Sequence, residues 1–317
     1  MKQAIIEQFG DVDKIKIIES ELPKISSSEV LIRVNSAGLN PKDILIRKGK
    51  FKQLAGRRFP QGIGFEFSGV IETANNSNYN KGDKVFGMVN GWQGQCCAEY
   101  VKIKETEVYL MPENISFDES AGIPLAGQTA LQAIRDLGKL GTKKSILING
   151  ASGGVGTLAI QIAKELGGKV TTISSTSNLA FCKSLGADLT LSYQETNILE
   201  LGSTFDLFFD VFGNFSFQKV APILKKKGRY ITTVPKPAII KEQFFNLFRS
   251  KKAKLVVVKS NKKDLKWLNQ KISTNKIKPV VDKIYGFNEI KAAQKYIESK
   301  RAKGKVILTI HPTNDQA

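Results

Sequence analysis

The stretch SILINGASGGVGTLAIQIAKELGG, residues 145–168, joins a short apolar run, a cluster of glycines and a second apolar run. The first run, ILI at 146–148, is typical of a strand that is buried on both faces. After the glycines, apolar residues recur three and four positions apart, which places them on one face of a helix. Gly167 and Gly168 provide the usual C-terminal stop. The stretch therefore predicts a strand, a tight turn and a helix in direct succession.

The glycines of this turn follow the pattern Ala151-x-Gly153-x-x-Gly156, which is G-x-G-x-x-G with alanine in the first position. Such a turn lets a pyrophosphate approach the backbone and lie on the free N–H groups at the positive end of the helix. The alternative is a glycine-rich turn that binds nothing. The strand before it and the helix after it favour a dinucleotide site.

Length and composition indicate an ordinary globular protein. The chain has 317 residues, of which 41% are hydrophobic and 24% charged, so it is long enough for one large domain or two ordinary ones. No apolar run approaches the roughly 20 residues of a membrane span. The N-terminus, MKQAIIEQFG, has polar and acidic breaks that a signal peptide lacks. We expect a cytoplasmic protein.

Cysteine and histidine are scarce. The cysteines are Cys96, Cys97 and Cys182, and the single histidine is His311. No C-x-x-C spacing occurs, and a structural or catalytic zinc site needs several such ligands. The sequence therefore predicts that no metal is bound through histidine and cysteine.

The formal net charge is +19, which is compatible with an anionic partner. However, the lysines are spread along the whole chain. The densest runs, 225–227 and 251–252, do not alternate with aromatic residues as a nucleic-acid stacking surface would. We interpret the charge as a solvated lysine-rich surface and expect no nucleic acid, while peripheral binding to an anionic membrane stays open.

The pattern of elements changes along the chain. Residues 1–110 contain short strand-like runs between turn signals, including a plain surface turn at 74–82, as in a mostly antiparallel β-domain. Residues 117–137 have a helical pattern that is interrupted at Pro124. From residue 145, strands and helices alternate, which predicts an α/β fold with a doubly wound parallel sheet. The expected elements there are SILING, helix 154–166, KVTTISS, helix 177–185, LTLSY, FDLFFDVFG, helix 215–225, GRYITTV and KLVVVK, followed by helix 262–273, the strand VVDKIYG, helix 288–299 and the strand KVILTI.

The end of the second strand of such a sheet selects the nicotinamide cofactor. An acid about 20 residues past the glycines binds the ribose 2′-hydroxyl of NAD. Here the strand ends in Ser174-Ser175-Thr176-Ser177-Asn178, whose hydroxyls and amide can donate to a 2′-phosphate. We therefore predict NADP(H) in preference to NAD(H). The same residues can also act as turn and cap residues for the next helix.

Several motifs, in order, resemble one family over nearly the whole length. They are AGLNPKDILIRKGKF (37–51), PQGIGFEFSGVI (60–71), KGDKVFG (81–87), AEYV (98–101), MPENISFDESAGIPLAGQTAL (111–131), the glycine turn, SLGAD (184–188) and KGKVILTI at the end. The chain resembles the zinc-independent quinone oxidoreductase (zeta-crystallin-like) branch of the medium-chain dehydrogenase/reductase superfamily. Its C-terminal part is most similar to the subgroup of chloroplast-envelope quinone oxidoreductase homologues, alkenal/enone oxidoreductases and reticulon-interacting proteins.

This resemblance implies a two-domain architecture. Residues 1–124 and 260–317 would form a GroES-like catalytic domain, and 125–259 an inserted Rossmann NADP(H)-binding domain, with the cofactor in the cleft between them. It also implies homodimers joined by the last Rossmann strand, here Lys254–Val258. The implied activity is hydride transfer from NADPH to quinones or α,β-unsaturated carbonyls.

At two sites this chain lacks residues that related enzymes use in catalysis, which limits the reactions that we expect. Zinc-dependent relatives carry a Cys and a His-Glu pair where this chain has AGL at 37–39 and GFE at 64–66. Zinc-activated alcohol oxidation is therefore not expected. Enoyl-thioester reductases carry a tyrosine proton donor where this chain has Phe51, which cannot donate a proton. The resemblance thus favours a quinone or enone as substrate.

Without zinc, hydrogen-bond donors must polarise the substrate carbonyl. By resemblance, Asn40 lies near the nicotinamide ribose and carbonyl, with Arg47 in the same stretch, and Thr129 lies beside the nicotinamide. The alternatives are a structural ion pair that closes the turn for Arg47 and an ordinary helix-interior residue for Thr129. Phe51 and Trp92 are the expected substrate-contacting residues, although Trp92 is equally a loop anchor. No general acid can be named.

The resemblance also implies cofactor contacts. The expected residues are Ser152, Gly153, Gly154 and Val155 for the pyrophosphate, Ser174, Ser175, Asn178 and Tyr193 for the adenosine ribose phosphate, and Phe212, Val234, Lys303 and Lys305 for the remainder. Tyr193 has an alternative role in packing on the sheet, and a surface position accounts equally well for either lysine. A second hypothesis is a non-catalytic protein that binds the cofactor as a scaffold or binds an anionic surface.

Overall fold

The computed structural model describes residues 1–75, 78–202 and 204–311, which form two compact units. Unit 1 comprises Met1–Leu125, Lys259–Asn275 and the part of the chain from Pro279 onward. Unit 2 comprises Ala126–Val258 and Lys276–Lys278. The central segment of unit 2 differs by one residue at each end from the 125–259 expected for a Rossmann domain.

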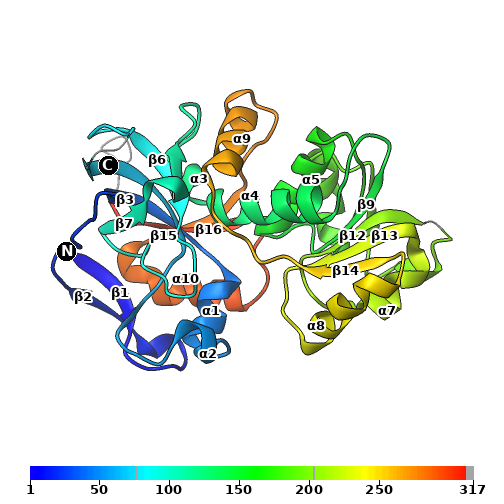
Figure 1. Cartoon of the computed structure of the whole chain (residues 1–317), viewed down its shortest axis with the longest axis horizontal. Coiled ribbons are helices and arrows are strands. Elements are labelled where there is room, and N and C mark those ends of the chain that lie inside the picture. Colours follow the sequence, from blue (N-terminus) through cyan, green and yellow to red (C-terminus); the bar gives the residue numbers. More distant parts are fainter. Residues whose placement is uncertain (76–77, 203, 312–317) are drawn as a thin grey trace. The chain divides into compact units, whose positions relative to one another are not determined.

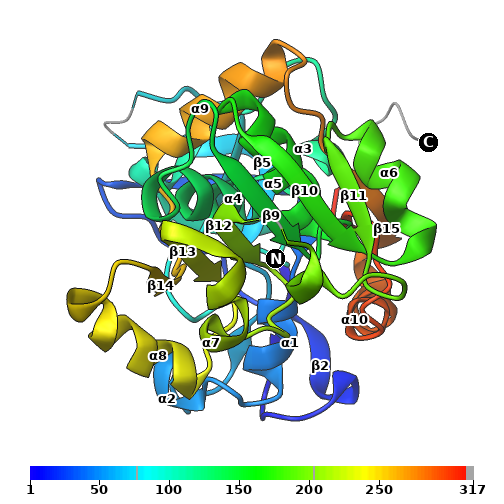
Figure 2. The same ribbon diagram turned by 90° about the vertical axis from the view of Figure 1, so that its right-hand side faces the viewer.

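Unit 2 is built on a parallel sheet whose strand order is β11-β10-β9-β12-β13-β14 (Figure 2). The strands are β9 (Ser145–Asn149), β10 (Lys169–Ser174), β11 (Leu189–Ser192), β12 (Phe205–Asp210), β13 (Leu224–Thr232) and β14 (Lys252–Leu255). In chain order this is 3-2-1-4-5-6, the order of a dinucleotide-binding sheet, whose ligand lies where the order reverses. Here that point falls between β9 and β12.

Helices cover both faces of this sheet (Figure 1). They are α4 (Pro124–Leu131), α5 (Gly154–Glu165), α6 (Leu179–Ser184), α7 (Phe217–Val220) and α8 (Pro237–Phe244). Leu147 of β9 and Phe208 of β12 pack with Phe217 and Ile239 in one hydrophobic cluster. Because strand side chains alternate, the neighbouring buried Ile146 and Ile148 face the opposite side of the sheet. Burial on both faces explains why ILI is a continuous apolar run.

Unit 1 is mostly antiparallel. Its sheets have the orders β2-β1-β4 and β15-β16-β3-β5-β6-β8, with β7 also paired to β3. The strands are β1 (Lys2–Ile6), β2 (Ile15–Glu19), β3 (Glu29–Leu39), β4 (Gln61–Gly62), β5 (Glu66–Ala74), β6 (Lys84–Met88), β7 (Tyr100–Lys104), β8 (Val108–Leu110), β15 (Val281–Gly286) and β16 (Lys305–Thr309). Strand β16 pairs Leu39 with Val306, so the C-terminal segment lies next to the end of β3.

Unit 1 contains the helices α1 (Pro41–Arg47), α2 (Lys52–Ala55), α3 (Phe117–Ala121), α9 (Lys262–Ser273) and α10 (Ile290–Glu298). Helix α10 contributes Ile290, Ala293 and Ile297 to a cluster that also contains Leu39 and Leu308. The hydrophobic core of this unit is thus completed by residues from both ends of the chain.

Three expectations about elements were wrong in detail. The helix expected over 215–225 is shortened to α7 and a 3-10 turn at Ala221–Ile223, because β13 already begins at Leu224. Strand β14 ends at Leu255, three residues before the expected end of the edge strand at Val258. Helix α8 was not expected, although Pro237 stands at its first position, where proline is favoured. The turn expected at 74–82 includes residues 76–77, which lie outside the described part of the chain.

Candidate cofactor and substrate sites

The glycine turn of unit 2 joins β9 to α5 with close backbone contacts. Gly150 has φ +79°, a left-handed conformation that side chains other than glycine rarely adopt. A Cβ on Gly156 would lie 2.2 Å from the carbonyl oxygen of Gly150, so only glycine lets the helix approach the strand this closely. A Cβ on Gly153 would meet nothing nearer than the Gly150 carbonyl oxygen at 3.7 Å, which is an ordinary contact. The fold therefore requires glycine at Gly156 and does not require it at Gly153.

Asp210, at the end of β12, fixes the loop that faces this turn. Its Oδ1 accepts hydrogen bonds from Asn149 Nδ2 at 2.7 Å and from the Gly213 N–H at 2.8 Å. Its Oδ2 accepts from the Tyr230 hydroxyl at 2.9 Å and from the Phe215 N–H at 3.1 Å. Burial, followed by the neighbouring Asp210 carboxylate, raises the pKa of Tyr230, so this hydroxyl remains a donor. A single buried carboxylate thus joins three of the strand ends that border the expected site.

The turn fits a dinucleotide pyrophosphate. The first N–H groups of α5 have no acceptor within the helix and point out of its N-terminus. Asn178 Nδ2 donates to Ser152 Oγ at 3.1 Å, which brings the end of β10 to the turn. Asn178 Oδ1 is buried and has no partner among the described residues, as expected where a ligand would supply one. Ser152, Gly153, Gly154, Val155 and Asn178 are therefore the residues that would hold the cofactor.

The end of β10 differs from the expected 2′-phosphate site in the burial of Ser174 and in the presence of a nearby acid. Ser174 is 4% exposed and its hydroxyl bonds to the carbonyl of Ser175, so it is buried beneath the surface that a 2′-phosphate would contact. The Ser175 hydroxyl is paired with that of Ser177 at 3.1 Å. Glu195, from the loop after β11, accepts a hydrogen bond from Thr176 Oγ1 at 2.8 Å. The strand end itself has no acid, but the fold brings one to it.

The other expected cofactor residues of unit 2 differ in exposure. Tyr193 and Phe212 are 63% and 52% exposed, and both lie next to strand ends of the parallel sheet. Val234 is partly buried and is among the residues lining a small pocket of about 30 Å³ with Gly213 and Lys236. Thr129 is 6% exposed within α4. These contacts with a cofactor stay predictions.

In unit 1, Asn40 is fixed by a buried polar cluster. Its Nδ2 donates to Glu66 Oε1 at 2.8 Å and to the Gly38 carbonyl at 3.3 Å, and its Oδ1 accepts from Lys305 Nζ at 2.7 Å. Asn40 is 3% exposed. The carboxamide therefore has one fixed orientation, with its oxygen toward the ammonium group.

Lys305 belongs to this cluster, which argues against the expected contact with the cofactor. It is 5% exposed, and its Nζ also donates to Glu66 Oε1 at 2.6 Å and to the Leu39 carbonyl at 3.1 Å. All three ammonium protons are therefore used inside unit 1. Lys303, two residues earlier, is exposed on the surface. The motif at 60–71 contained Glu66, but the sequence alone did not indicate that its partner would come from the last strand.

Glu66 also fixes the start of α4. Its Oε2 accepts a hydrogen bond from the Leu125 N–H at 2.6 Å, and the residue has 0% exposure. A carboxylate at a helix N-terminus satisfies an otherwise unpaired donor and interacts favourably with the helix dipole. The same side chain thus joins the start of α4 to Asn40 and Lys305.

Asp43 closes the turn before α1. Its Oδ2 accepts from the Asn40 N–H at 2.7 Å and its Oδ1 from the Gly64 N–H at 3.0 Å. Burial raises the pKa of Asp43 to about 6, although both hydrogen bonds and Lys305 act in the opposite direction. This carboxyl has a structural role, because it fixes the backbone of the turn.

Arg47 has a structural role in place of the expected catalytic one. It is 1% exposed, and its guanidinium donates to Gln294 Oε1 at 2.7 Å, to the Gly10 carbonyl at 2.7 Å and to the Glu298 carboxylate. Three of the five guanidinium N–H donors are thus bound to α10 and to the loop after β1, and a side chain buried this deeply is not accessible to a substrate. The alternative, a structural ion pair, describes this residue.

The two expected substrate residues lie together. The rings of Phe51 and Trp92 have centroids 4.9 Å apart. Lys42 Nζ lies 5.2 Å from the Trp92 ring and 3.7 Å from the centroid of Phe65, and it donates to the Gly91 carbonyl at 2.7 Å. Nothing in the sequence distinguishes Lys42 from other lysines, because a single lysine carries no signal by itself.

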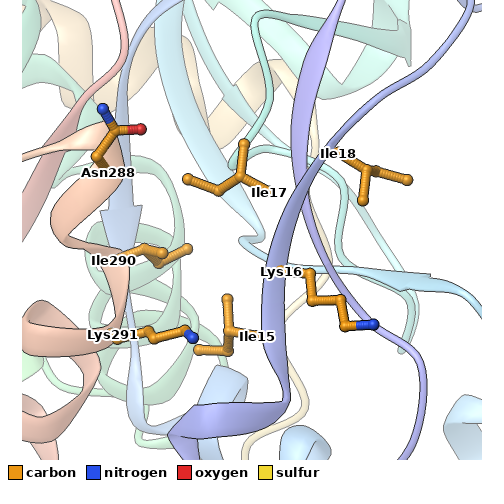
Figure 3. A pocket seen from close by; sticks show the side chains of 7 residues that line it. All are labelled: Ile15, Lys16, Ile17, Ile18, Asn288, Ile290 and Lys291. Atoms are coloured by element: carbon orange, nitrogen blue, oxygen red, sulfur yellow. The ribbon is translucent and has the colours of Figure 1, made fainter.

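Three other observations concern metals, membranes and pockets. Among the described residues, no cluster of three or more His, Cys, Asp or Glu could hold a metal ion, and no helix is long and apolar enough to cross a bilayer. A pocket of about 370 Å³ lies between β2 and the segment that leads into α10 (Figure 3). Ile15 and Ile17 face Ile290 there, and none of the lining residues is an expected site residue.

Comparisons with known proteins agree with this architecture. The alcohol dehydrogenase GroES-like domain matches residues 26–122, and the zinc-binding dehydrogenase model matches 185–308. The 2-methylene-furan-3-one reductase of Solanum lycopersicum is 35% identical over 98% of this chain and 79% of its own length. The NADPH-dependent alkenal/one oxidoreductase, chloroplastic, of Arabidopsis thaliana is also 35% identical, over 97% of this chain and 79% of its own length.

A solved structure gives the same result. The quinone oxidoreductase of Coxiella burnetii superimposes with a TM-score of 0.89 at 30% identity, covering 98% of this chain and 99% of the other. The fold and the relatives together define an oxidoreductase with a GroES-like and a Rossmann-like part. The chain belongs to the quinone oxidoreductase branch of the medium-chain dehydrogenase/reductase superfamily, as its motifs predicted.

Proposed function

We propose that this protein is an NADPH-dependent, zinc-independent oxidoreductase that transfers hydride to quinones or to α,β-unsaturated carbonyls. The observation that carries the proposal is the likeness to two plant oxidoreductases, over 98% and 97% of this chain, whose names specify a conjugated ketone and alkenals or alkenones. The glycine turn supports it, because a Cβ at Gly153 would be crowded by nothing. In addition, Asn178, which donates to Ser152 in the turn, has a buried amide oxygen that lacks a partner among the described residues. When bound, NADPH would supply the hydride, and the chain would supply position and a dry environment.

The preference for NADPH rests on the name of one relative and on the polar end of β10. The carboxylate of Glu195 acts against it, since an acid near this position repels a 2′-phosphate. Ser175, Ser177 and Asn178 offer donors, and the net charge of +19 favours an anionic cofactor in general. We take the donors and the overall positive field to outweigh one solvent-exposed carboxylate, because water and salt screen an exposed charge.

Zinc independence is part of the proposal. The segments that carry zinc ligands in zinc-dependent relatives read AGL at 37–39 and GFE at 64–66 in this chain, and the glutamate of the second is bonded to Lys305. A carboxylate paired with a buried ammonium is a poor candidate for a metal ligand. The residues present therefore do not fit a zinc ion, and we derive no step through one.

The experiment is a substrate panel with both cofactors. Purified protein is mixed with NADPH or NADH and with 9,10-phenanthrenequinone, short enones and alkenals, and the loss of dihydronicotinamide absorbance is followed. Turnover with NADPH and at least one such acceptor is expected, with a lower kcat/KM for NADH. Tighter binding of NADH would contradict the cofactor preference. Inactivity across the panel, together with salt-sensitive binding to anionic vesicles, would support the non-catalytic alternative.

Assembly and location complete the proposal. We propose a homodimer that forms along β14, which is the last strand of the parallel sheet. An exposed apolar surface lies beside it on α8 and the following turn, with Ile240, Phe244, Leu247 and Phe248 between 62% and 84% exposed. Such a surface is typical of an interface. We propose a cytoplasmic location, although the names of several relatives place those proteins in chloroplasts or mitochondria.

A further inference from the structure

Lys42 holds an ammonium group among aromatic rings next to the Asn40 cluster. It is the second residue of α1, two positions after Asn40. Its Nζ lies 3.7 Å from the centroid of Phe65, which is 1% exposed, and 5.2 Å from the Trp92 ring. The Trp92 ring in turn contacts Phe51. One cation and three aromatic rings therefore form a single cluster within unit 1.

We propose that Lys42 is a catalytic residue, which stabilises the developing oxyanion of a conjugated carbonyl substrate and supplies its proton. This inference rests on the proposed function and assigns the acid that the sequence did not reveal. The flat aromatic faces of Trp92 and Phe51 would suit a planar enone, and the ammonium would lie at its carbonyl end.

The geometry leaves Lys42 free to act. An ammonium group has three protons, and the Gly91 carbonyl, 2.7 Å away, takes one of them. The adjacent carboxylate of Asp43 accepts hydrogen bonds from the Asn40 and Gly64 backbones instead. Lys42 is partly buried beside the Phe65 ring, so water screens its charge less than on an open surface, and the charge stabilises an oxyanion more strongly than it would in bulk water.

The protonation of Lys42 suits this role. Burial lowers the pKa of Lys42 to about 8, while the nearby Asp43 and Cys96 act in the opposite direction. Below pH 8 the group is mostly the ammonium form, yet it is a stronger acid than an ordinary lysine, whose pKa is about 10.4. A general acid works best when its pKa lies near the working pH.

The proposed reaction needs only NADPH, the substrate and a proton that water replaces. The hydride supplied by NADPH forms a new C–H bond at the β-carbon, and the C=C electron pair moves to give an enolate. The proton passes from Lys42 Nζ to the enolate oxygen and gives an enol, which becomes the saturated ketone by tautomerisation. The neutral amine of Lys42 then takes a proton from water, so no further oxidant or reductant is needed.

A structural alternative is that Lys42 only fastens the Gly91 loop to Phe65. The variants Lys42→Met and Lys42→Arg separate the two roles. Methionine keeps the aliphatic contact with the ring but has no charge or proton, whereas arginine keeps the charge but is too weak an acid to transfer a proton at pH 7. Lys50→Met, at an exposed position just after α1, is the matched control.

We expect kcat for an enone to fall at least about 100-fold in Lys42→Met, within the usual range for general acid catalysis. Lys42→Arg should give an intermediate kcat, and Lys50→Met should match wild type. The wild-type kcat should decline above about pH 8 as Lys42 loses its proton, and this decline should be absent in Lys42→Met. Near-ultraviolet circular dichroism and NADPH binding should be unchanged in all three variants.

Two results would overturn the proposal about Lys42. One is a folded Lys42→Met protein with kcat within twofold of wild type; the other is a decline above pH 8 that persists in this variant. In both cases the wild-type turnover would leave the proposed function standing. If Lys42→Met fails to fold, the pH profile of Lys42→Arg decides, because a decline near pH 8 in that variant contradicts the assignment. Wild-type turnover with a quinone but with no enone or alkenal would overturn the proposal about Lys42 alone, whereas inactivity across the whole panel would overturn both proposals.

Discussion

At the scale of single residues, the cluster of Glu66, Lys305 and Asn40 shows how buried charge is tolerated in unit 1. Glu66 and Lys305 are 0% and 5% exposed, and every polar side-chain atom of the three residues has a hydrogen-bond partner. Removing one member of such a pair leaves an uncompensated charge in a low dielectric, which costs far more than the loss of an exposed pair. The cluster is thus more sensitive to substitution than its size indicates.

The variant Glu66→Gln should therefore destabilise the protein by about 3–5 kcal/mol, measured by urea unfolding. Its matched control is Glu72→Gln in the same strand, where Glu72 pairs with the exposed Lys81. That change should cost about 0–1 kcal/mol. Equal costs for the two variants would contradict the role of the buried cluster.

The raised pKa of Asp43 predicts how the free energy of unfolding depends on pH. Its folded-state pKa of about 6 lies above the value of 3.8 for an unperturbed carboxyl, so between these values the folded state binds more protons than the unfolded state. The contribution of Asp43 to the free energy of unfolding is therefore greatest below about pH 4 and falls as the pH rises through about 6, by about 3 kcal/mol in total.

The check is the difference in unfolding free energy between wild type and Asp43→Asn at pH values from 4 to 7. This difference should decrease as the pH rises, because asparagine does not titrate. A difference that grows with pH would show that the hydrogen bonds from Asn40 and Gly64, which lower the pKa, outweigh burial.

At the scale of elements, the turn between β9 and α5 contains one glycine that the fold requires and another that we expect only the ligand to require. A Cβ at Gly156 would lie 2.2 Å from the Gly150 carbonyl oxygen, whereas a Cβ at Gly153 would make only an ordinary contact of 3.7 Å with the same oxygen. Gly153 also has φ −82°, which any residue adopts. The two glycines of the pattern are therefore required for different reasons.

Gly156→Ala should lower the unfolding free energy by about 1–3 kcal/mol, since the helix must move away from the strand. Gly153→Ala should cost less than about 1 kcal/mol but weaken NADPH binding at least about tenfold, because its methyl group would occupy the approach of the pyrophosphate. Calorimetric titration and thermal unfolding measure the two effects. If Gly153→Ala binds NADPH as wild type does, the pyrophosphate does not lie where we propose.

At the scale of the whole molecule, unit 2 has one exposed apolar surface that its own chain does not cover. On α8 and the turn after it, Phe244, Leu247 and Phe248 are 69%, 84% and 79% exposed. They lie beside the outer edge of β14, where the side chains of Asn246 and Gln243 bond to the backbone of Ala253 and Leu255. Large apolar side chains rarely face water in such a group on a monomeric protein. A second copy placed along the same edge would cover them.

Light scattering after size exclusion should accordingly give a dimer near twice the chain mass of 34.9 kDa. The double variant Leu247→Lys and Phe248→Lys should shift the protein toward monomer. Leu22→Lys, at a position in unit 1 that is 53% exposed, is the control and should not shift it. A wild-type monomer that binds anionic vesicles through this surface would support the membrane alternative instead.

Much of this protein could be predicted from local pattern. The apolar run at 146–148, the glycines that follow and the alternation of elements after residue 145 predicted the parallel sheet, because each signal spans only one strand, turn or helix. The same local reading failed at the start of β13 and the end of β14, where pairing with neighbouring strands overrides propensity.

The sequence by itself determined the fold class, the family and the position of the dinucleotide turn, since each of these depends on motifs that lie within about 25 consecutive residues, and the family on the order of several such motifs along the chain. Only the tertiary structure decided that Lys305 pairs with Glu66, 239 residues away, that Arg47 is bound to α10, and that Glu195 lies at the end of β10. Burial and charge pairing depend on which segments the fold brings together. Lys42 shows this dependence most clearly. Its neighbours Phe65 and Gly91 come from two separate segments of the chain, and these contacts distinguish it from other lysines.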